Sequence, residues 1–196
     1  MNIWFCGMSG VGKSTLLQQL ETRFTPLNPG LFHFSIDCID LDREIEKNLT
    51  ARGILHSLSL GDFLRVSLEN VQVFRQIESD LISQILQRKQ KEKEICMIAL
   101  GGGALTAEHF KIIKSHSHQL LCYLKDDFEK IWIRLSAHPE KLLANKSREE
   151  VYQIYLKRSE IFEKSDLIIE FEQLKGIEEI DALGHNLIEK LIQDLK

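Results

Sequence analysis

The stretch that decides the fold lies near the N-terminus and reads Gly7-Met8-Ser9-Gly10-Val11-Gly12-Lys13-Ser14-Thr15. Residues 7–14 match the phosphate-loop pattern G-x-x-x-x-G-K-[ST]. Glycines at these spacings let the backbone turn tightly, so that its N–H groups point at phosphate oxygens. A glycine-rich turn with an incidental lysine is the alternative interpretation. The phosphate loop is favoured because an apolar strand candidate precedes it and a helix candidate follows it.

This loop predicts a nucleoside triphosphate site that works with Mg²⁺. Lys13 is placed to reach the β- and γ-phosphates and to take part in catalysis, and the Ser14 hydroxyl is placed to ligate Mg²⁺. The N-terminal end of the following helix adds positive charge. We expect the nucleotide to contact Gly10, Val11, Gly12, Lys13, Ser14 and Thr15.

Outside the loop, short apolar segments alternate with helical ones. We predict strands at Asn2–Cys6, Phe32–Ile39, Ile95–Leu100, Gln119–Leu124 and Leu167–Phe171. We predict helices at Lys13–Phe24, Asp42–Leu49, Phe128–Leu135, Glu149–Glu163 and Ile177–Leu195, with one or two more between Leu60 and Arg88. Thr25–Gly30 is predicted as a loop and His138–Ser147 as irregular. The alternation predicts an α/β protein, a three-layer αβα P-loop kinase fold with a central five-stranded parallel sheet, formed by residues 1–196 as a single domain.

Composition narrows the partners. A net charge of −4 favours neither nucleic acid nor an anionic membrane, and no apolar run approaches the ~20 residues that a membrane span needs. The basic run at residues 88–93 is interpreted as a solvated helix end. The four cysteines form no CxxC pair and fit a reducing cytoplasm, and no signal peptide is recognised. We therefore expect a cytoplasmic monomer that binds small molecules.

The chain also lacks the marks of other phosphate-loop proteins. Asn145-Lys146, its Asn-Lys pair, continues with Ser-Arg and so fails the guanine-reading NKxD pattern. Motor ATPases usually need a longer chain and a strand that ends in Asp-Glu. The length is typical of a small metabolite kinase.

Two carboxylates follow the second predicted strand. Asp40 and Asp42 stand at the carboxyl edge of the expected sheet, where ligands of parallel sheets bind. One carboxylate suits the Mg²⁺ hydration shell and the other suits the orientation and deprotonation of an acceptor hydroxyl. Capping of the next helix is the alternative role.

Several motifs together resemble the shikimate kinase family. They occur in the family's order, from about Asn2 to Glu170, and comprise the phosphate loop, Asp40-Leu41-Asp42-Arg43-Glu44-Ile45-Glu46, Phe74-Arg75-Gln76-Ile77-Glu78, Gly101-Gly102-Gly103 and Arg158. The resemblance implies ATP-dependent phosphorylation of shikimate at its 3-hydroxyl, which gives shikimate 3-phosphate and ADP in the chorismate and aromatic amino acid pathway.

The resemblance also implies roles for individual residues. Asp40 would lie near the magnesium through water, and Asp42 would bind the shikimate hydroxyls and act as the base. Arg75 and Arg158 would clamp the shikimate carboxylate, which matches a guanidinium fork. Glu78 would orient Arg75. Gly102 and Gly103 would bring backbone N–H groups close to the substrate. Arg134 would pack on the adenine.

Each of these residues also has a purely structural interpretation. Arg75 and Glu78 are spaced as an i,i+3 surface ion pair. The glycine triplet would also serve as a flexible turn, and Arg158 and Arg134 would also suit solvated helix faces.

The expected lid departs from the family pattern. The sequence His138-Pro139-Glu140-Lys141-Leu142-Leu143 stands where the family has R-P-L-L, so that Glu140 replaces the arginine that reaches the transferring phosphate. Lys141 is the candidate substitute, as a point charge without the guanidinium fork. Such an arginine is worth several orders of magnitude in rate, so the change bears on turnover and not on nucleotide binding. We expect the lid at residues 136–148.

The acceptor-binding lobe, expected at residues 41–88, is also unusual. The segment between Glu46 and Phe74 and the segment between Lys13 and Asp40 are both longer than is usual in the family. Asn70 stands about where the family tends to have glycine. Two alternatives therefore stay open: a related kinase for another small carboxylated polyol such as gluconate, and a nucleotide-binding protein with degenerate catalysis.

Overall fold

The central sheet is parallel throughout. A computed structural model of the chain describes residues 1–24, 35–55, 59–89, 94–174 and 176–193. Within them, the five strands are β1 (Asn2–Cys6), β2 (Ser35–Asp40), β3 (Glu94–Ala99), β4 (Gln119–Lys125) and β5 (Leu167–Glu170). They lie in the order β2-β3-β1-β4-β5, and each neighbouring pair is parallel.

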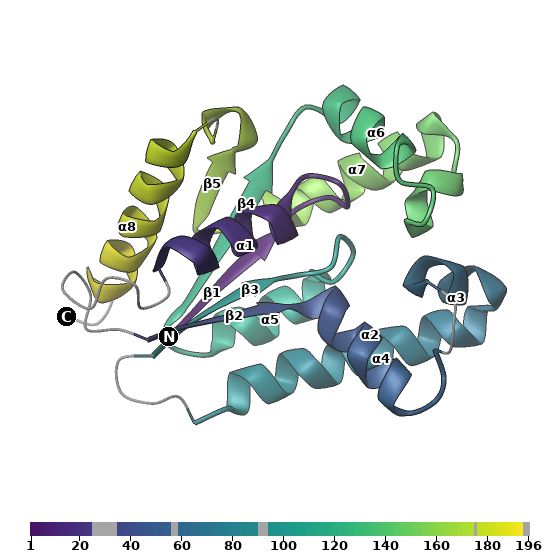
Figure 1. The fold of residues 1–196 in the computed structure, drawn as a ribbon, viewed down its shortest axis with the longest axis horizontal. Helices are drawn as coiled ribbons and strands as arrows, with labels where there is room; N and C mark the ends of the chain where they lie inside the picture. The colour runs from purple at the N-terminus through teal and green to yellow at the C-terminus, as the bar shows by residue number, and fades with distance from the viewer. Residues whose placement is uncertain (25–34, 56–58, 90–93, 175, 194–196) are drawn as a thin grey trace.

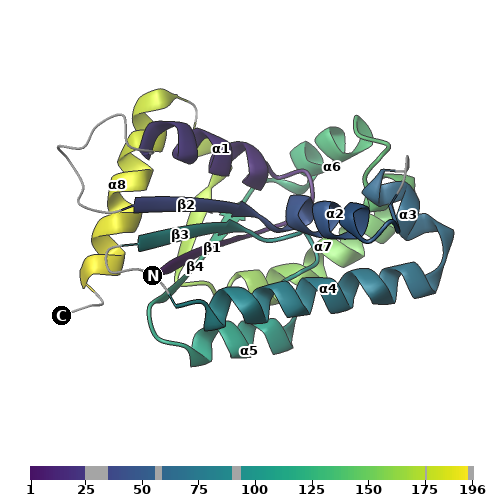
Figure 2. The same ribbon diagram turned by 60° about the horizontal axis from the view of Figure 1, so that its bottom comes forward.

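Helices cover both faces of this sheet. They are α1 (Lys13–Phe24), α2 (Leu41–Ala51), α3 (Leu60–Val66), α4 (Leu68–Gln87), α5 (Ala107–Ser115), α6 (Phe128–Ser136), α7 (Arg148–Phe162) and α8 (Ile177–Gln193), with the 3₁₀ turns η1 (Leu142–Asn145) and η2 (Phe171–Gln173). Helices α1 and α8 cover one face, and α4, α5 and α7 lie on the other (Figures 1 and 2). The predicted three-layer αβα fold is confirmed.

Burial on both faces explains the apolar character of the inner strands. Every residue of β1 and β3 is buried, as expected for parallel strands with helices on both sides. Trp4 is fully buried, and its indole N–H donates to Gln119 Oε1 at 2.7 Å, so that burial leaves no unsatisfied donor there. Within the described residues, no helix has the length and apolar content to cross a membrane.

The register of the sheet brings the predicted motifs to one edge. Asp40 at the end of β2 pairs with Ala99 of β3, and Ala99 pairs with Phe5 of β1. The phosphate loop, the start of α2 and the glycine triplet therefore leave the sheet side by side, at the carboxyl edge where ligands bind in such folds.

Two groups of helices extend beyond this edge. One comprises α2, α3 and the first part of α4, and the other comprises α6, η1 and the segment between them (Figure 1). They meet where α3 packs against η1.

The structure refines several predicted boundaries. The predicted Leu60–Arg88 region is two helices, because Ser67 has extended backbone and its side chain caps α4 by accepting from the Asn70 N–H. Helix α5 was not predicted, although Thr106 caps it in the same way. The predicted irregular region His138–Ser147 contains η1. The predicted loop Thr25–Gly30 and the first residues of the predicted Phe32–Ile39 strand lie outside the described residues.

Candidate active site

A cleft of about 710 Å³ opens at the carboxyl edge of the sheet. The structure brings all predicted site residues together along its wall: Gly10, Val11, Gly12, Lys13, Ser14, Thr15, Asp40, Asp42, Arg75, Gly102, Gly103, Arg134 and Arg158. The phosphate loop lies between the two helical groups described above. A ligand that fills the cleft would contact the loop, the α2–α4 group and the α6–η1 group at once.

The phosphate loop has the backbone that its sequence predicts. Gly10 and Gly12 have φ values of 86° and 106°, a region that L side chains rarely adopt. A Cβ at Gly12 would also lie 2.8 Å from Cε2 of Phe171, so this glycine admits the ring beside the loop. These glycines give the loop the tight turns that its motif requires.

Lys13 is the buried cation of this loop. Its ammonium donates to the carbonyl oxygens of Gly7 at 2.8 Å and Met8 at 3.0 Å. Burial lowers the pKa of Lys13 to about 8, and the negative charge of Asp42 opposes this shift. A phosphate brought to this ammonium would replace lost hydration and stabilise its charge.

Asp40 and Asp42 occupy different positions at the start of α2. Asp40 is the N-cap, and its carboxylate accepts from the Arg43 N–H at 3.3 Å, so the capping interpretation is correct for Asp40. Asp42 lies in the first turn of α2, lines the cleft and is exposed to solvent. The protein groups around its carboxyl still remove part of its hydration, which raises its pKa, while Lys13 lowers it. A carboxyl with this environment has the properties of a general base.

Gly101 makes room for the carboxylates. A Cβ at Gly101 would lie 2.5 Å from Asp42 Oδ1 and 3.2 Å from Glu78 Oε1. A Cβ at Gly102 would lie 2.5 Å from the Ser9 N, which shows how closely the triplet passes the phosphate loop. These are close approaches of packed groups, so the flexible-turn interpretation does not describe the triplet.

Arg75 and Glu78 form an ion pair in which the carboxylate is buried and the guanidinium is partly exposed. Arg75 Nη1 donates to Glu78 Oε2 at 2.5 Å, and the Glu78 side chain is 0% exposed. Burial raises the pKa of Glu78, and Arg75 opposes the shift. The other carboxylate oxygen, Oε1, is buried without a hydrogen-bond partner within the described structure. Glu78 therefore fixes the direction of the Arg75 guanidinium.

Arg158 reaches the same place from α7. Its Nη1 donates to the Gly102 carbonyl oxygen at 3.0 Å. A Cβ at Gly103 would lie 2.7 Å from Arg158 Nη2 and 2.9 Å from Arg75 Nη2, so the two guanidinium groups lie side by side. Burial, and next the charge of Arg75, lower the pKa of Arg158 to about 10. In the part of the chain described, no carboxylate forms an ion pair with Arg158, which is unlike a solvated helix face.

Arg134 lies at the opposite end of the cleft, beside the phosphate loop. Its guanidinium forms an ion pair with the buried Asp126 and lies over the Phe171 ring, 4.8 Å from the ring centroid. Sequence reasoning missed Asp126 and Phe171. Asp126 follows directly on β4, at the ligand-binding edge, and this position was the available signal.

The 136–148 segment contributes charges of both signs to the cleft. Glu140 forms an exposed ion pair with His138, whose Nδ1 is 3.0 Å from Glu140 Oε1. Lys141 lines the cleft, and its positive charge contributes to the lowered pKa of Lys13 and counteracts the raised pKa of Asp42. The cation of this segment therefore lies in the same cleft as the phosphate loop and the candidate base.

Comparison with known proteins identifies the family of the chain. The family model described as shikimate kinase matches residues 32–193. The shikimate kinase of Dictyoglomus turgidum is 29% identical over 194 residues, which cover 97% of this chain and 96% of that protein. The shikimate kinase of Chlorobaculum parvum is 30% identical over 178 residues, which cover 85% of this chain and 81% of that protein.

A solved structure extends the comparison to the fold. The shikimate kinase of Acinetobacter baumannii, in complex with shikimate, aligns with a TM-score of 0.68 over 98% of this chain and 93% of that one. The two sequences are 20% identical, so this likeness concerns the fold.

Proposed function

Because the chain belongs to the shikimate kinase family, we propose that its cleft transfers the γ-phosphoryl group of ATP to the 3-hydroxyl of shikimate, giving shikimate 3-phosphate and ADP. The observation that carries this proposal is the Arg75–Arg158 pair. Two adjacent guanidinium groups repel each other, and an anionic ligand between them would relieve this repulsion. Shikimate has one carboxylate and several hydroxyl groups, so it fits a site with two cations near a candidate base.

The nucleotide end of the site is formed by the phosphate loop. Its N–H groups and Lys13 bind the phosphates. Arg134 packs on the adenine, and the Arg134 guanidinium is held by Phe171 and Asp126. Ser14 and Asp40 offer a hydroxyl and a carboxylate oxygen at the cleft wall. This donor set suits Mg²⁺, which usually keeps several waters and binds one or two protein oxygens besides phosphate. Bound there, Mg²⁺ would neutralise part of the phosphate charge.

The acceptor end is formed by Asp42 and the arginine pair. Asp42 accepts the proton of the attacking hydroxyl, and its raised pKa makes it a stronger base than an ordinary carboxylate. Arg75 and Arg158 hold the shikimate carboxylate, with Glu78 orienting Arg75. Gly102 and Gly103 let the backbone pass close to the substrate, because a side chain at Gly103 would displace both guanidinium groups.

Residues 136–148 serve as the lid, and residues 41–88 as the acceptor-binding lobe. Lys141 takes the role that an arginine has in the family's lid, because its charge acts on Lys13 and Asp42. Glu140, which stands at the arginine's position in the sequence, pairs with His138. This arrangement favours an active enzyme over a nucleotide-binding protein with degenerate catalysis.

We further propose that the enzyme acts as a cytoplasmic monomer without a nucleic acid or membrane partner. The free thiols of Cys6, Cys38, Cys96 and Cys122 are typical of a reducing compartment, and the net charge of −4 gives no attraction to polyanions.

A coupled assay of ADP release tests the proposed function. The purified chain with ATP and Mg²⁺ should release ADP at a rate that depends on shikimate. Gluconate in place of shikimate is the control acceptor and should give no comparable rate. A rate that depends on gluconate, or no rate with either acceptor, would refute the assignment of the acceptor.

A further inference from the structure

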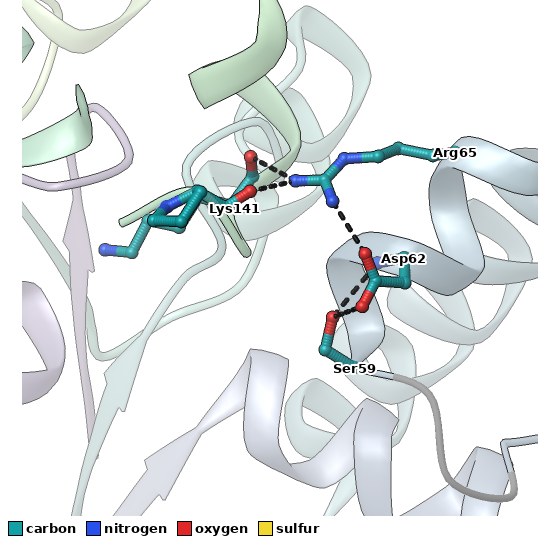
Figure 3. Close-up of polar contacts among 5 residues, drawn as sticks. Ser59, Asp62, Arg65 and Lys141 are labelled. Carbon is teal, nitrogen blue, oxygen red and sulfur yellow. Dashed lines mark hydrogen bonds and ion pairs between the residues drawn. The ribbon is translucent and has the colours of Figure 1, made fainter. Parts of the chain in front are cut away.

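The contact between the lid and the acceptor-binding lobe is built around one arginine of α3. Arg65 Nη2 donates to the carbonyl oxygens of Pro139 and Lys141, the latter at 3.0 Å. Its other terminal nitrogen, Nη1, donates to Asp62 Oδ1 at 2.7 Å. Figure 3 shows this guanidinium between the lid backbone and Asp62. A charged group with a fixed fork thus joins two segments that are far apart in the sequence.

Asp62 is itself held in place from the start of α3. Ser59 caps the helix by accepting from the Asp62 N–H at 3.1 Å, and the Ser59 hydroxyl donates to Asp62 Oδ2 at 2.7 Å. Hydrogen bonds from Ser59 to Asp62 and from Arg65 to Asp62 therefore hold the Arg65 guanidinium on the α3 side of the lid contact. The contact is directional, since both lid partners are backbone oxygens.

Gly61 permits the lid to come this close. A Cβ at Gly61 would overlap with the carbonyl oxygen of Glu140, so any side chain there would push the lid away from α3. Gly61 lies within α3, where alanine would favour the helix more than glycine does. Glycine at this position favours the helix less than alanine would, and it allows the Glu140 carbonyl oxygen to approach α3 closely.

The contact has a consequence for Lys141. Its carbonyl oxygen accepts from Arg65, and its side chain extends away from Arg65 (Figure 3). Lys141 lines the same cleft as Lys13 and Asp42, and its charge acts on both. Fixing the Lys141 backbone therefore limits where its ammonium can lie.

The contact is also linked to the acceptor site. The Asn70 side chain donates to the Phe63 carbonyl oxygen at 2.7 Å, and this bond joins α3 to α4, the helix that carries Arg75. The position of α3 is therefore tied to the helix that carries Arg75.

We propose that Arg65 is a positioning residue that holds the lid backbone against α3 and thereby places the Lys141 ammonium at the reacting phosphates. The inference rests on the proposed function for its chemistry. It assigns no contact between Arg65 and either substrate. Its test combines a kinetic measurement with a structural one that needs no activity.

The first variant is Arg65→Met, which keeps much of the aliphatic stem and removes the guanidinium. We expect kcat for shikimate phosphorylation to fall by about tenfold or more, because a misplaced catalytic group costs rate even when binding is kept. KM for shikimate should stay within about twofold, since the clamp arginines are intact. Arg65→Lys should rescue only part of the rate, because one ammonium lacks the fork that spans Asp62 and the lid. Arg52→Met, an exposed arginine after α2, is the matched control and should behave as the wild type.

The structural measurement is limited trypsin digestion without substrates, with fragments identified by mass spectrometry. Cleavage between Lys141 and Leu142 should be faster in Arg65→Met than in the wild type and in Arg52→Met. Unchanged cleavage at this bond, or an unchanged kcat, would overturn the proposal. A wild-type chain without shikimate-dependent activity would instead refute the proposed function, and the digestion would still report on the lid contact.

The second variant, Gly61→Ala, covers the case in which Arg65→Met does not fold. We expect Gly61→Ala to fold, with a melting temperature no higher than that of the wild type, because its methyl group meets the Glu140 carbonyl oxygen. Its kcat should nevertheless fall and its cleavage at Lys141 should accelerate, because the methyl group displaces the lid. Wild-type kcat in this variant would overturn the proposal.

Discussion

The guanidinium groups of Arg75 and Arg158 lie side by side at Gly103, where an added Cβ would be 2.9 Å from one and 2.7 Å from the other. Glu78 forms an ion pair with Arg75, whereas the hydrogen bond of Arg158 goes to the Gly102 carbonyl oxygen. The folded chain thus holds excess positive charge at one point of the cleft. Such a site costs stability in the free protein and gains affinity for an anion.

Arg158→Met should separate these two effects. Removing a cation whose pKa is lowered by burial and by Arg75 should leave the free energy of unfolding unchanged or raise it. KM for shikimate should rise by about 10- to 100-fold, from the loss of hydrogen bonds worth about 1.5–3 kcal/mol each. Thermal melting and steady-state kinetics measure the two quantities. Lys157→Met, the exposed neighbour on α7, is the control; a variant that binds shikimate normally would contradict the clamp.

Asp42→Asn should remove the base while keeping the nucleotide site. We expect kcat to fall by about 10²- to 10⁴-fold, the usual contribution of general base catalysis, with ATP affinity nearly intact. Titration calorimetry with ATP and the ADP-release assay measure the two effects. Glu44→Gln, which replaces a carboxylate of the same helix that forms an ion pair with Lys47, should have wild-type kcat. Full activity in Asp42→Asn would mean that another group takes the proton.

The pH dependence of ATP binding should report Lys13. Its pKa in the free protein is about 8, below the ordinary 10.5, and bound phosphates would raise it. Binding above pH 8 should therefore take up a proton, and Kd should increase by up to about tenfold per pH unit until the pKa of the complex is reached. The terminal phosphate is already ionised at these pH values. Calorimetry at pH 8.5–9.5 in buffers of different ionisation enthalpy measures the uptake; its absence would contradict the assignment.

Lys141→Met tests the lid cation directly. We expect kcat to fall on the order of 100-fold, as when one preorganised donor to the developing charge is removed. KM for ATP should change less, since Lys13 and the loop N–H groups remain. Lys141→Arg should keep most of the rate, and Lys146→Met, an exposed lysine of the same segment, should keep all of it. Single-turnover kinetics separate the chemical step from product release.

Local sequence predicted the nucleotide end of the site well. The conformation of the phosphate loop is set by residues that are adjacent in the sequence. Gly10 and Gly12 have the positive φ values that the motif requires. The sheet was predicted because β1 and β3 are apolar throughout, which reflects burial on both faces. Helix α5 was missed because its nine residues show only a short apolar pattern, although Thr106 was available as a cap.

Contacts between distant segments could not be predicted in the same way. The bond from Arg65 to the lid uses the backbone oxygens of Pro139 and Lys141, which carry no signal in the sequence. The burial of Glu78 was also hidden, since Arg75 and Glu78 have the spacing of an ordinary surface pair. Asp40 is the N-cap of α2 and also lies at the cleft wall, so its capping role leaves room for the proposed role near Mg²⁺.

A crystal structure of the chain with shikimate and ADP tests the proposed site most directly. The shikimate carboxylate should lie between the guanidinium groups of Arg75 and Arg158, and its 3-hydroxyl should lie within hydrogen-bond distance of Asp42 and face the phosphate loop. Shikimate bound with its carboxylate away from both arginines, or with its 3-hydroxyl away from Asp42, would contradict the proposed function of these residues.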